Sequence, residues 1–250
     1  MIAPGLTDAL DRWLAELGAV GGRSANTTKA YRADLLAFLA FLQAYEGDTL
    51  GSARLAQLDT ATMRAWMAHE RNRGLGARSL ARALSAVKGF VGWLAERDGF
   101  DPTPMLMTRS PRFQKKLPRP LAADAARTMI ETVEMQSTTG WVARRDMAVV
   151  TLLYGCGLRI SEALLLTGRD IPLGETIRIV GKGGKERIVP VIPAARRAMT
   201  SYLAACPYEI TPETAAFRGV RGRPLGARQI QKVMEKTRAQ LGLPASATPH

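Results

Sequence analysis

Residues 154–164 read Tyr-Gly-Cys-Gly-Leu-Arg-Ile-Ser-Glu-Ala-Leu, and the interpretation of the surrounding chain starts from this stretch. The apolar run Val142–Tyr154 predicts a buried helix that ends at the Gly-Cys-Gly turn. After the turn, Arg159 stands at the start of a short predicted helix, Ile160–Leu166, and Glu162 follows three residues later. A planar guanidinium held by rigid neighbours can grip a phosphate with two hydrogen bonds, and Glu162 is placed to orient a neighbouring group. On spacing alone, a plain surface arginine is an equally good interpretation of Arg159.

A glycine-rich turn between two short apolar segments predicts a β-hairpin downstream. Residues 176–181 and 186–191 have the composition of strands, and they flank Lys182-Gly-Gly-Lys185. A lysine on such a turn can reach into a cleft as a proton donor, which makes Lys182 the first candidate and Lys185 the second. A solvated turn lysine is the alternative. The phosphate-binding loop of nucleotide hydrolases is excluded, because an acidic residue follows Lys185 where that motif requires Ser or Thr and then a helix.

Three further helices are predicted around these two motifs. They cover Ala122–Glu134, the segment from Pro193 through Ala204, and the basic amphipathic stretch Gly226–Leu241. The C-terminal part of the chain, residues 119–250, therefore predicts an α+β domain with a small β-hairpin sheet.

The first 99 residues predict a domain of four helices. The helices cover Thr7–Gly18, a long stretch from the capping residue Asn26 to about Gly47, a third capped by Thr60, and a fourth that starts near Ser79. Five prolines and several basic residues follow in residues 100–118, which predict a stiff, extended, basic linker. The predicted fold is thus mainly α, with a helical N-terminal domain, a linker and the α+β domain.

The composition favours a polyanionic partner. Thirty-five basic and 22 acidic residues give a net charge of +13, and 46% hydrophobic residues are too many for a disordered chain. No Cys/His cluster has zinc-ligand spacing, and neither a membrane span nor a secretory signal is seen, so a reduced, cytoplasmic protein is expected. Two stretches, 71–95 and 102–123, contain basic but no acidic residues, which favours nucleic acid. The candidate phosphate contacts are Lys29, Arg32, Arg78, Arg82, Lys88, Lys115, Lys116, Arg187, Arg221 and Arg223.

Taken together, these segments resemble the tyrosine recombinases, the phage-integrase family, and most closely its bacterial Xer-type branch in the XerC-like form. Residues 26–35, Asn-Thr-Thr-Lys-Ala-Tyr-Arg-Ala-Asp-Leu, are similar to the opening of the family's SAM-like core-binding domain. The segments around Arg159 and Lys182 are similar to those that bear the catalytic arginine and lysine. The terminal Thr248-Pro-His is similar to the opening of the family's His-x-x-Arg box.

The resemblance implies a function for each of these residues. Arg159 would be an activating arginine, Lys182 the general acid and His250 an acid/base partner, with Glu162 and Lys185 in support. Such enzymes cut one strand of duplex DNA by tyrosine attack, form a 3′-phosphotyrosyl link, and use no metal or cofactor. The family also implies a tetramer on two duplexes, here with a second, XerD-like recombinase, in the resolution of chromosome dimers before cell division.

The family's second arginine, second histidine and tyrosine nucleophile lie downstream of the His-x-x-Arg opening, whereas this sequence stops at His250. We therefore expect a catalytic domain truncated at its C-terminus and inactive alone. The alternatives are a non-catalytic DNA-binding module and a mobile-element integrase. An RNA-binding protein is disfavoured, because aromatic residues are only 6% of the chain.

Overall fold

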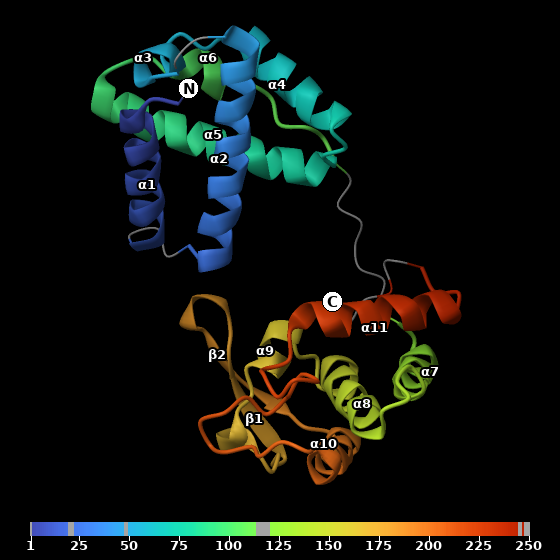
Figure 1. The fold of residues 1–250 in the computed structure, drawn as a ribbon. Helices are drawn as coiled ribbons and strands as arrows, with labels where there is room; N and C mark the ends of the chain where they lie inside the picture. The colour runs from blue at the N-terminus through green and yellow to red at the C-terminus, as the bar shows by residue number, and fades with distance from the viewer. Residues whose placement is uncertain (1, 20–22, 48–49, 114–120, 245–246, 248–250) are drawn as a thin grey trace. The chain divides into compact units, whose positions relative to one another are not determined.

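The computed structural model describes residues 2–19, 23–47, 50–113, 121–244 and 247. The chain forms two compact units, residues 1–115 and 116–250, and each has its own hydrophobic core. The predicted class is confirmed: helices dominate, and the second unit contains a single two-stranded antiparallel sheet among its described residues (Figure 1). Within the described ranges, no helix is both long and apolar enough to cross a membrane.

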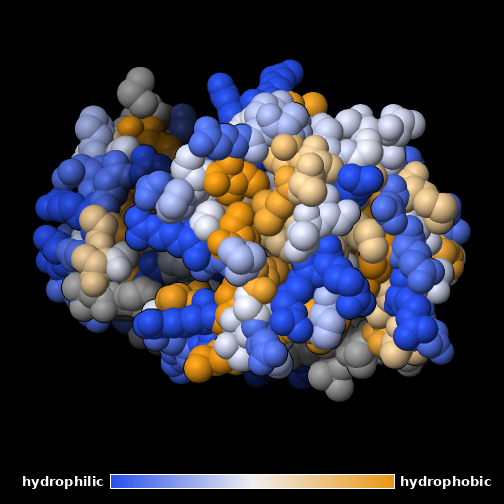
Figure 2. All heavy atoms as spheres, turned by 90° about the horizontal axis from the view of Figure 1, so that it is seen from below, coloured by the Kyte–Doolittle hydropathy of each residue, from blue (hydrophilic) through white to orange (hydrophobic). Residues whose placement is uncertain are grey.

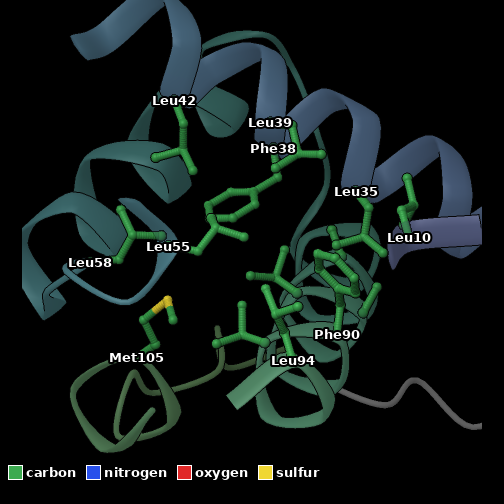
Figure 3. Packing of buried hydrophobic residues seen from close by; sticks show 14 of the residues in the cluster. Leu10, Leu35, Phe38, Leu39, Leu42, Leu55, Leu58, Phe90, Leu94 and Met105 are labelled. Carbon is green, nitrogen blue, oxygen red and sulfur yellow. The ribbon is translucent and has the colours of Figure 1, made fainter. Parts of the chain in front are cut away.

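Four long helices build the first unit, as predicted: α1 (Pro4–Ala19), α2 (Ala25–Glu46), α4 (Thr60–Asn72) and α5 (Ala77–Asp98). Two short helices, α3 (Ser52–Leu55) and α6 (Thr103–Leu106), were not anticipated. The core that these helices enclose is seen in Figure 3, where Phe38 and Phe90 lie among leucines from α1, α2 and α5. Phe38 also meets the Trp66 ring edge-on, at 5.0 Å between ring centres.

Two predicted helix caps were wrong by one or two residues. The Ser24 hydroxyl, and not Asn26, caps α2 by accepting a hydrogen bond from the Thr27 N–H. The Asp59 carboxylate caps α4 by accepting from the Thr62 N–H at 2.7 Å, and this bond lowers the pKa of Asp59. In both cases a residue that can also cap lies slightly earlier in the chain, where the backbone is still extended.

The predicted linker is not extended throughout. Residues 103–106 form α6, and Met105 is buried in the core of the first unit. The Lys88 ammonium on α5 donates hydrogen bonds to the carbonyl oxygens of Leu106 and Thr108, at the C-terminal end of α6. Partial burial lowers the pKa of Lys88. Lys88 therefore has a structural role that its position in an acid-free basic stretch did not indicate.

The second unit is built around α8 (Gly140–Gly155), which packs between α7 (Ala123–Glu134) and α10 (Pro193–Ala205). Nearly all of α8 from residue 142 to 153 is buried, as its apolar sequence predicts. The short α9 (Ile160–Leu164) follows it, and α11 (Ala227–Gln240) is the last helix of the described chain. The predicted helices and the hairpin are all present.

The hairpin consists of β1 (Thr176–Val180) and β2 (Glu186–Pro190), joined by a 3₁₀ turn, Lys182–Gly184. Ile177, Ile179 and Val189 face the core, whereas Val180 and Ile188 are 56% and 74% exposed. On the face that Figure 2 draws, hydrophobic residues are interspersed with hydrophilic ones.

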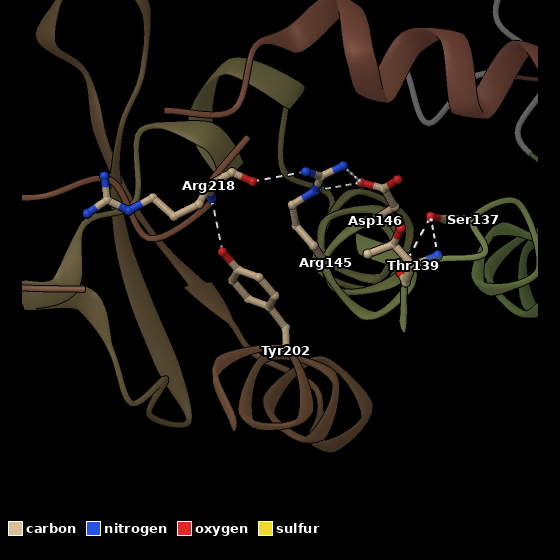
Figure 4. Close-up of polar contacts among 6 residues, drawn as sticks. All are labelled: Ser137, Thr139, Arg145, Asp146, Tyr202 and Arg218. Atoms are coloured by element: carbon tan, nitrogen blue, oxygen red, sulfur yellow. Dashed lines mark hydrogen bonds and ion pairs between the residues drawn. The ribbon is translucent and has the colours of Figure 1, made fainter. Parts of the chain in front are cut away.

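A buried polar network connects α8 and α10 to the loop before α11 (Figure 4). Arg145 on α8 pairs with Asp146 at 2.7 Å and donates to the Arg218 carbonyl oxygen at 2.9 Å. The Tyr202 hydroxyl on α10 accepts the Arg218 N–H at 3.0 Å and donates to the Ala216 carbonyl. These bonds hold the loop in place. Arg145 and Tyr202 are buried, so a lost hydrogen bond would leave a polar group without access to solvent.

Candidate functional site

The candidate site is centred on Glu162, whose side chain is only 5% exposed. Its carboxylate accepts hydrogen bonds from the backbone N–H and from Nη1 of Arg159, each at 2.8 Å. Arg159 is the N-cap residue of α9, and Glu162 is the third residue of that helix, so this reciprocal contact follows from local helix geometry. Leu158, fully buried just before Arg159, anchors the turn. The Arg159 side chain itself is 62% exposed, so its remaining N–H donors are open to a ligand.

A second arginine binds the same carboxylate from the hairpin. Arg187 on β2 donates from Nη1 and Nη2 to the two oxygens of Glu162, at 2.8 and 2.7 Å. The Arg187 bonds, with those of Arg159, lower the pKa of Glu162 to about 2. Glu162 is therefore ionised at neutral pH, and its carboxylate forms ion pairs with the guanidinium groups of both Arg159 and Arg187.

The glycine-rich turn lies next to this cluster. The Gly181 N–H donates to the Lys185 carbonyl at 2.7 Å and closes the hairpin end. A β-carbon on Gly181 would lie 3.3 Å from that carbonyl oxygen, 3.6 Å from Nη1 of Arg187 and 3.8 Å from Oε1 of Glu162. Gly183 and Gly184 both have positive φ, at 75° and 73°, which glycine adopts without strain. Gly181, the residue before Lys182, thus lies beside Arg187 and Glu162.

The structure brings together three of the predicted residues: Arg159, Glu162 and Arg187. Lys185 is exposed on the turn. The side chain of Lys182 and the whole of His250 lie outside the described residues. The pairing of Arg187 with Glu162 was missed by sequence reasoning, because nothing local connects residues 25 positions apart.

The predicted phosphate contacts of the first unit differ in their surroundings. Lys29 and Arg78 are exposed on α2 and α5. Arg32 pairs with Asp11, and Arg82 makes two hydrogen bonds to Asp34, at 2.9 and 3.0 Å.

Arg78 and Arg82 also line a surface hollow of about 620 Å³, which they share with Ser110 and Phe113. The predicted contacts Lys115 and Lys116 lie outside the described residues.

Arg221 and Arg223 are exposed on a tight turn of the second unit. The Gly219 N–H donates to the Arg223 carbonyl at 2.7 Å, and Gly222 has a φ of 76°. Among the described residues, no group of three His, Cys, Asp or Glu side chains gathers as metal ligands.

An exposed arginine seated on a buried carboxylate, beside a lysine-bearing turn, can stabilise negative charge on a phosphoryl group through fixed cationic donors. This arrangement is therefore suited to binding a phosphoryl group.

The comparisons with known proteins name the family. Residues 10–98 match the profile "Phage integrase, N-terminal SAM-like domain", and residues 120–250 match "Phage integrase family". The chain belongs to the phage integrase family of tyrosine recombinases, whose members cut and rejoin DNA strands.

Two relatives are the tyrosine recombinases XerC of Brucella suis and of Rhodospirillum centenum. The first is 42% identical over 98% of this chain and 78% of its own length; the second is 43% identical over 99% and 73%. Among solved structures, a lambda integrase dimer bound to a COC′ core site matches with a TM-score of 0.68 and 20% identity, over 98% of this chain and 85% of that one. The last match shows that the fold is shared.

Proposed function

We propose that this chain provides the DNA-binding and arginine–lysine parts of a site-specific recombinase that cuts and rejoins duplex DNA through a 3′-phosphotyrosyl intermediate. The observation that carries the proposal is the cluster of Arg159, Glu162 and Arg187 beside the turn that bears Lys182. The family membership and the similarity to proteins named XerC support it.

Arg159 would bind a nonbridging oxygen of the scissile phosphate. Charge on these oxygens grows as a tyrosine oxygen attacks phosphorus, so a fixed guanidinium stabilises the transition state more than the ground state. Glu162 sets the direction of the guanidinium and leaves its other donors exposed.

The bond from phosphorus to the 5′-oxygen breaks as the tyrosine–phosphorus bond forms, and the leaving oxygen needs a proton. Lys182 would donate that proton, with Lys185 as the second candidate, and His250 would act as an acid/base partner. The tyrosine itself would come from the segment that the family places downstream of His250.

The basic residues of both units would contact DNA phosphates. We assign residues 1–99 to DNA binding, 100–118 to the linker and 119–250 to catalysis. In the first unit the contacts are led by Lys29 and Arg78, whose side chains are exposed, and in the second by Arg221 and Arg223.

The biological task that we propose is the resolution of chromosome dimers before cell division, in the bacterial cytoplasm. The active assembly would be a tetramer on two duplexes that includes a second, XerD-like recombinase. The support is the similarity to proteins named XerC and the fold shared with a lambda integrase tetramer bound to a Holliday junction.

The test is cleavage of a nicked suicide substrate by the recombinase in its full gene-encoded length. Arg159→Ala should abolish the covalent protein–DNA band while DNA affinity stays within a few-fold of the parent, because the lost contact acts in the transition state. Equal cleavage by variant and parent would refute the assignment.

The two lysines are separated by sulfur substitution at the 5′-bridging oxygen. A thiolate leaves without a proton, so this substrate should restore cleavage by Lys182→Ala. Lys185→Ala is the matched control and should cleave both substrates at nearly the parent rate. The reverse pattern would move the general acid to Lys185.

A further inference from the structure

We propose that Arg187 is a positioning residue that locks the hairpin bearing Lys182 onto the helix bearing Arg159, so that proton delivery to the leaving oxygen depends on it. The inference rests on the proposed function. It also removes Arg187 from the expected phosphate contacts.

The guanidinium of Arg187 is already engaged. Both of its terminal nitrogens donate to Glu162, whose side chain is only 5% exposed, while Arg187 itself is 37% exposed. A parallel pair of bonds to a carboxylate fixes both the distance and the plane of the guanidinium. A DNA phosphate would have to compete with an ionised partner that is held in place by α9.

The position of Arg187 in the hairpin makes this contact a connection between two elements. Arg187 pairs with Ile179 across the sheet and lies on the inward side of β2, as Val189 does, whereas Ile188 points to solvent. The turn with Lys182 begins a few residues away, and Gly181 passes close to both Arg187 and Glu162. Loss of the bidentate contact would free the whole hairpin end relative to α9.

The shared oxygen couples the two cationic groups. Oε1 of Glu162 accepts from Nη1 of Arg159 and from Nη1 of Arg187, each at 2.8 Å. Oε1 of Glu162 therefore helps to position two groups. One is the arginine that would hold the phosphate, and the other is the turn that would supply the proton. A lysine at position 187 would keep the charge but make only a point contact, so it could not fix the plane.

The hairpin carries its own control. Arg178 on β1 pairs with Glu186 across the exposed face of the same sheet, with the Arg178 side chain 69% exposed. Arg178→Gln removes one hairpin arginine and one ion pair, as Arg187→Gln does, but leaves Glu162 untouched.

The first measurement is amide hydrogen exchange in residues 176–190 and does not require cleavage. Arg187→Gln should raise exchange at Gly181 by at least about tenfold, because the closing bond to Lys185 opens more often. Arg178→Gln should change it by less than about threefold. Equal exchange in the two variants would overturn the proposed connection, even if the parent protein never cleaved DNA.

The second measurement is single-turnover cleavage of matched oxygen and 5′-sulfur substrates by the full gene-encoded recombinase. Arg187→Gln should slow cleavage of the oxygen substrate by about 10²-fold, and sulfur should reduce this deficit to below about tenfold. Arg187→Lys should fall between parent and Arg187→Gln. A deficit that sulfur does not reduce would mean that Arg187 acts on Arg159 alone, which overturns the link to the proton.

DNA affinity separates the inference from a phosphate contact. Arg187→Gln should leave the salt dependence of binding unchanged, whereas loss of a phosphate contact would reduce the slope of log affinity against log salt by about 0.9. A reduced slope would return Arg187 to the phosphate contacts. Failure of the parent to form a covalent band would refute the proposed function and leave the exchange result to decide the connection.

Discussion

The charge on Glu162 should contribute to the stability of the second unit in a pH-dependent way, and Glu162→Gln tests this contribution. The pKa of Glu162 is about 2, against an ordinary value of 4.5, chiefly because Arg187 donates to its carboxylate. With one pKa unit worth about 1.36 kcal/mol, the ionised carboxylate stabilises the folded unit by roughly 3 kcal/mol at pH 7.

The sign of the effect follows from the lower pKa in the folded state. The stabilisation is complete above about pH 5 and declines as the pH falls toward 2, so that roughly 1.4 kcal/mol remains at pH 3. Gln has nearly the same shape but no charge. We expect the variant to be about 2–3 kcal/mol less stable than the parent at pH 7 and about 1 kcal/mol less stable at pH 3.

Native-state hydrogen exchange in α8 as a function of urea is the assay, because this buried helix reports on the second unit alone. Glu186→Gln is the control: its partner Arg178 is on the exposed face of the hairpin, so the variant should lose much less stability. A stability loss in Glu162→Gln that is the same at pH 7 and pH 3, or that the control matches, would refute the reasoning.

Three further predictions concern binding and packing. The affinity for duplex DNA should fall steeply with salt, and a titration that gives a flat plot of log affinity against log salt would contradict the phosphate contacts. Gly168→Ala should destabilise the second unit by about 3 kcal/mol in urea unfolding, because its β-carbon would lie 2.2 Å from the Thr211 backbone oxygen; a variant as stable as the parent would show that the loop can shift. Tyr202→Phe should cost about 1–3 kcal/mol in free energy of unfolding, because it removes the acceptor of the part-buried Arg218 N–H, and unchanged melting would indicate that another group takes its place.

Elements whose signal lies within one short stretch could be predicted from the sequence. The apolar run before Gly155 indicates α8, and that helix is buried nearly throughout. Alternating residues on either side of two glycines indicate the hairpin, and Ile177, Ile179 and Val189 do face the core. The signal for each element comes from residues close together in the chain, through the spacing of the apolar residues that face the core.

Contacts between distant side chains could not be predicted in the same way. Arg32 and Arg82 were predicted as phosphate contacts, but Asp11 and Asp34 pair with them in the folded unit. Charge counting cannot reveal such pairs, because it ignores which helix faces which. The short helix α6 was hidden for a related reason: its prolines indicate a linker, while the burial of Met105 is decided by the rest of the core.

The hairpin turn also has a consequence for how this protein can change over generations. A β-carbon added at Gly181 would contact a carbonyl oxygen and a guanidinium. Gly183 and Gly184 occupy left-handed backbone conformations, which cost other residues about 1–2 kcal/mol each. Any single-nucleotide change at these three codons that replaces the glycine with another residue introduces a side chain. The turn is therefore a stretch with little mutational freedom, even where its atoms face open solvent. Neighbouring exposed positions, such as Ile188, have no such restriction, so sequence drift in this hairpin is expected to collect on the strands and to spare the turn.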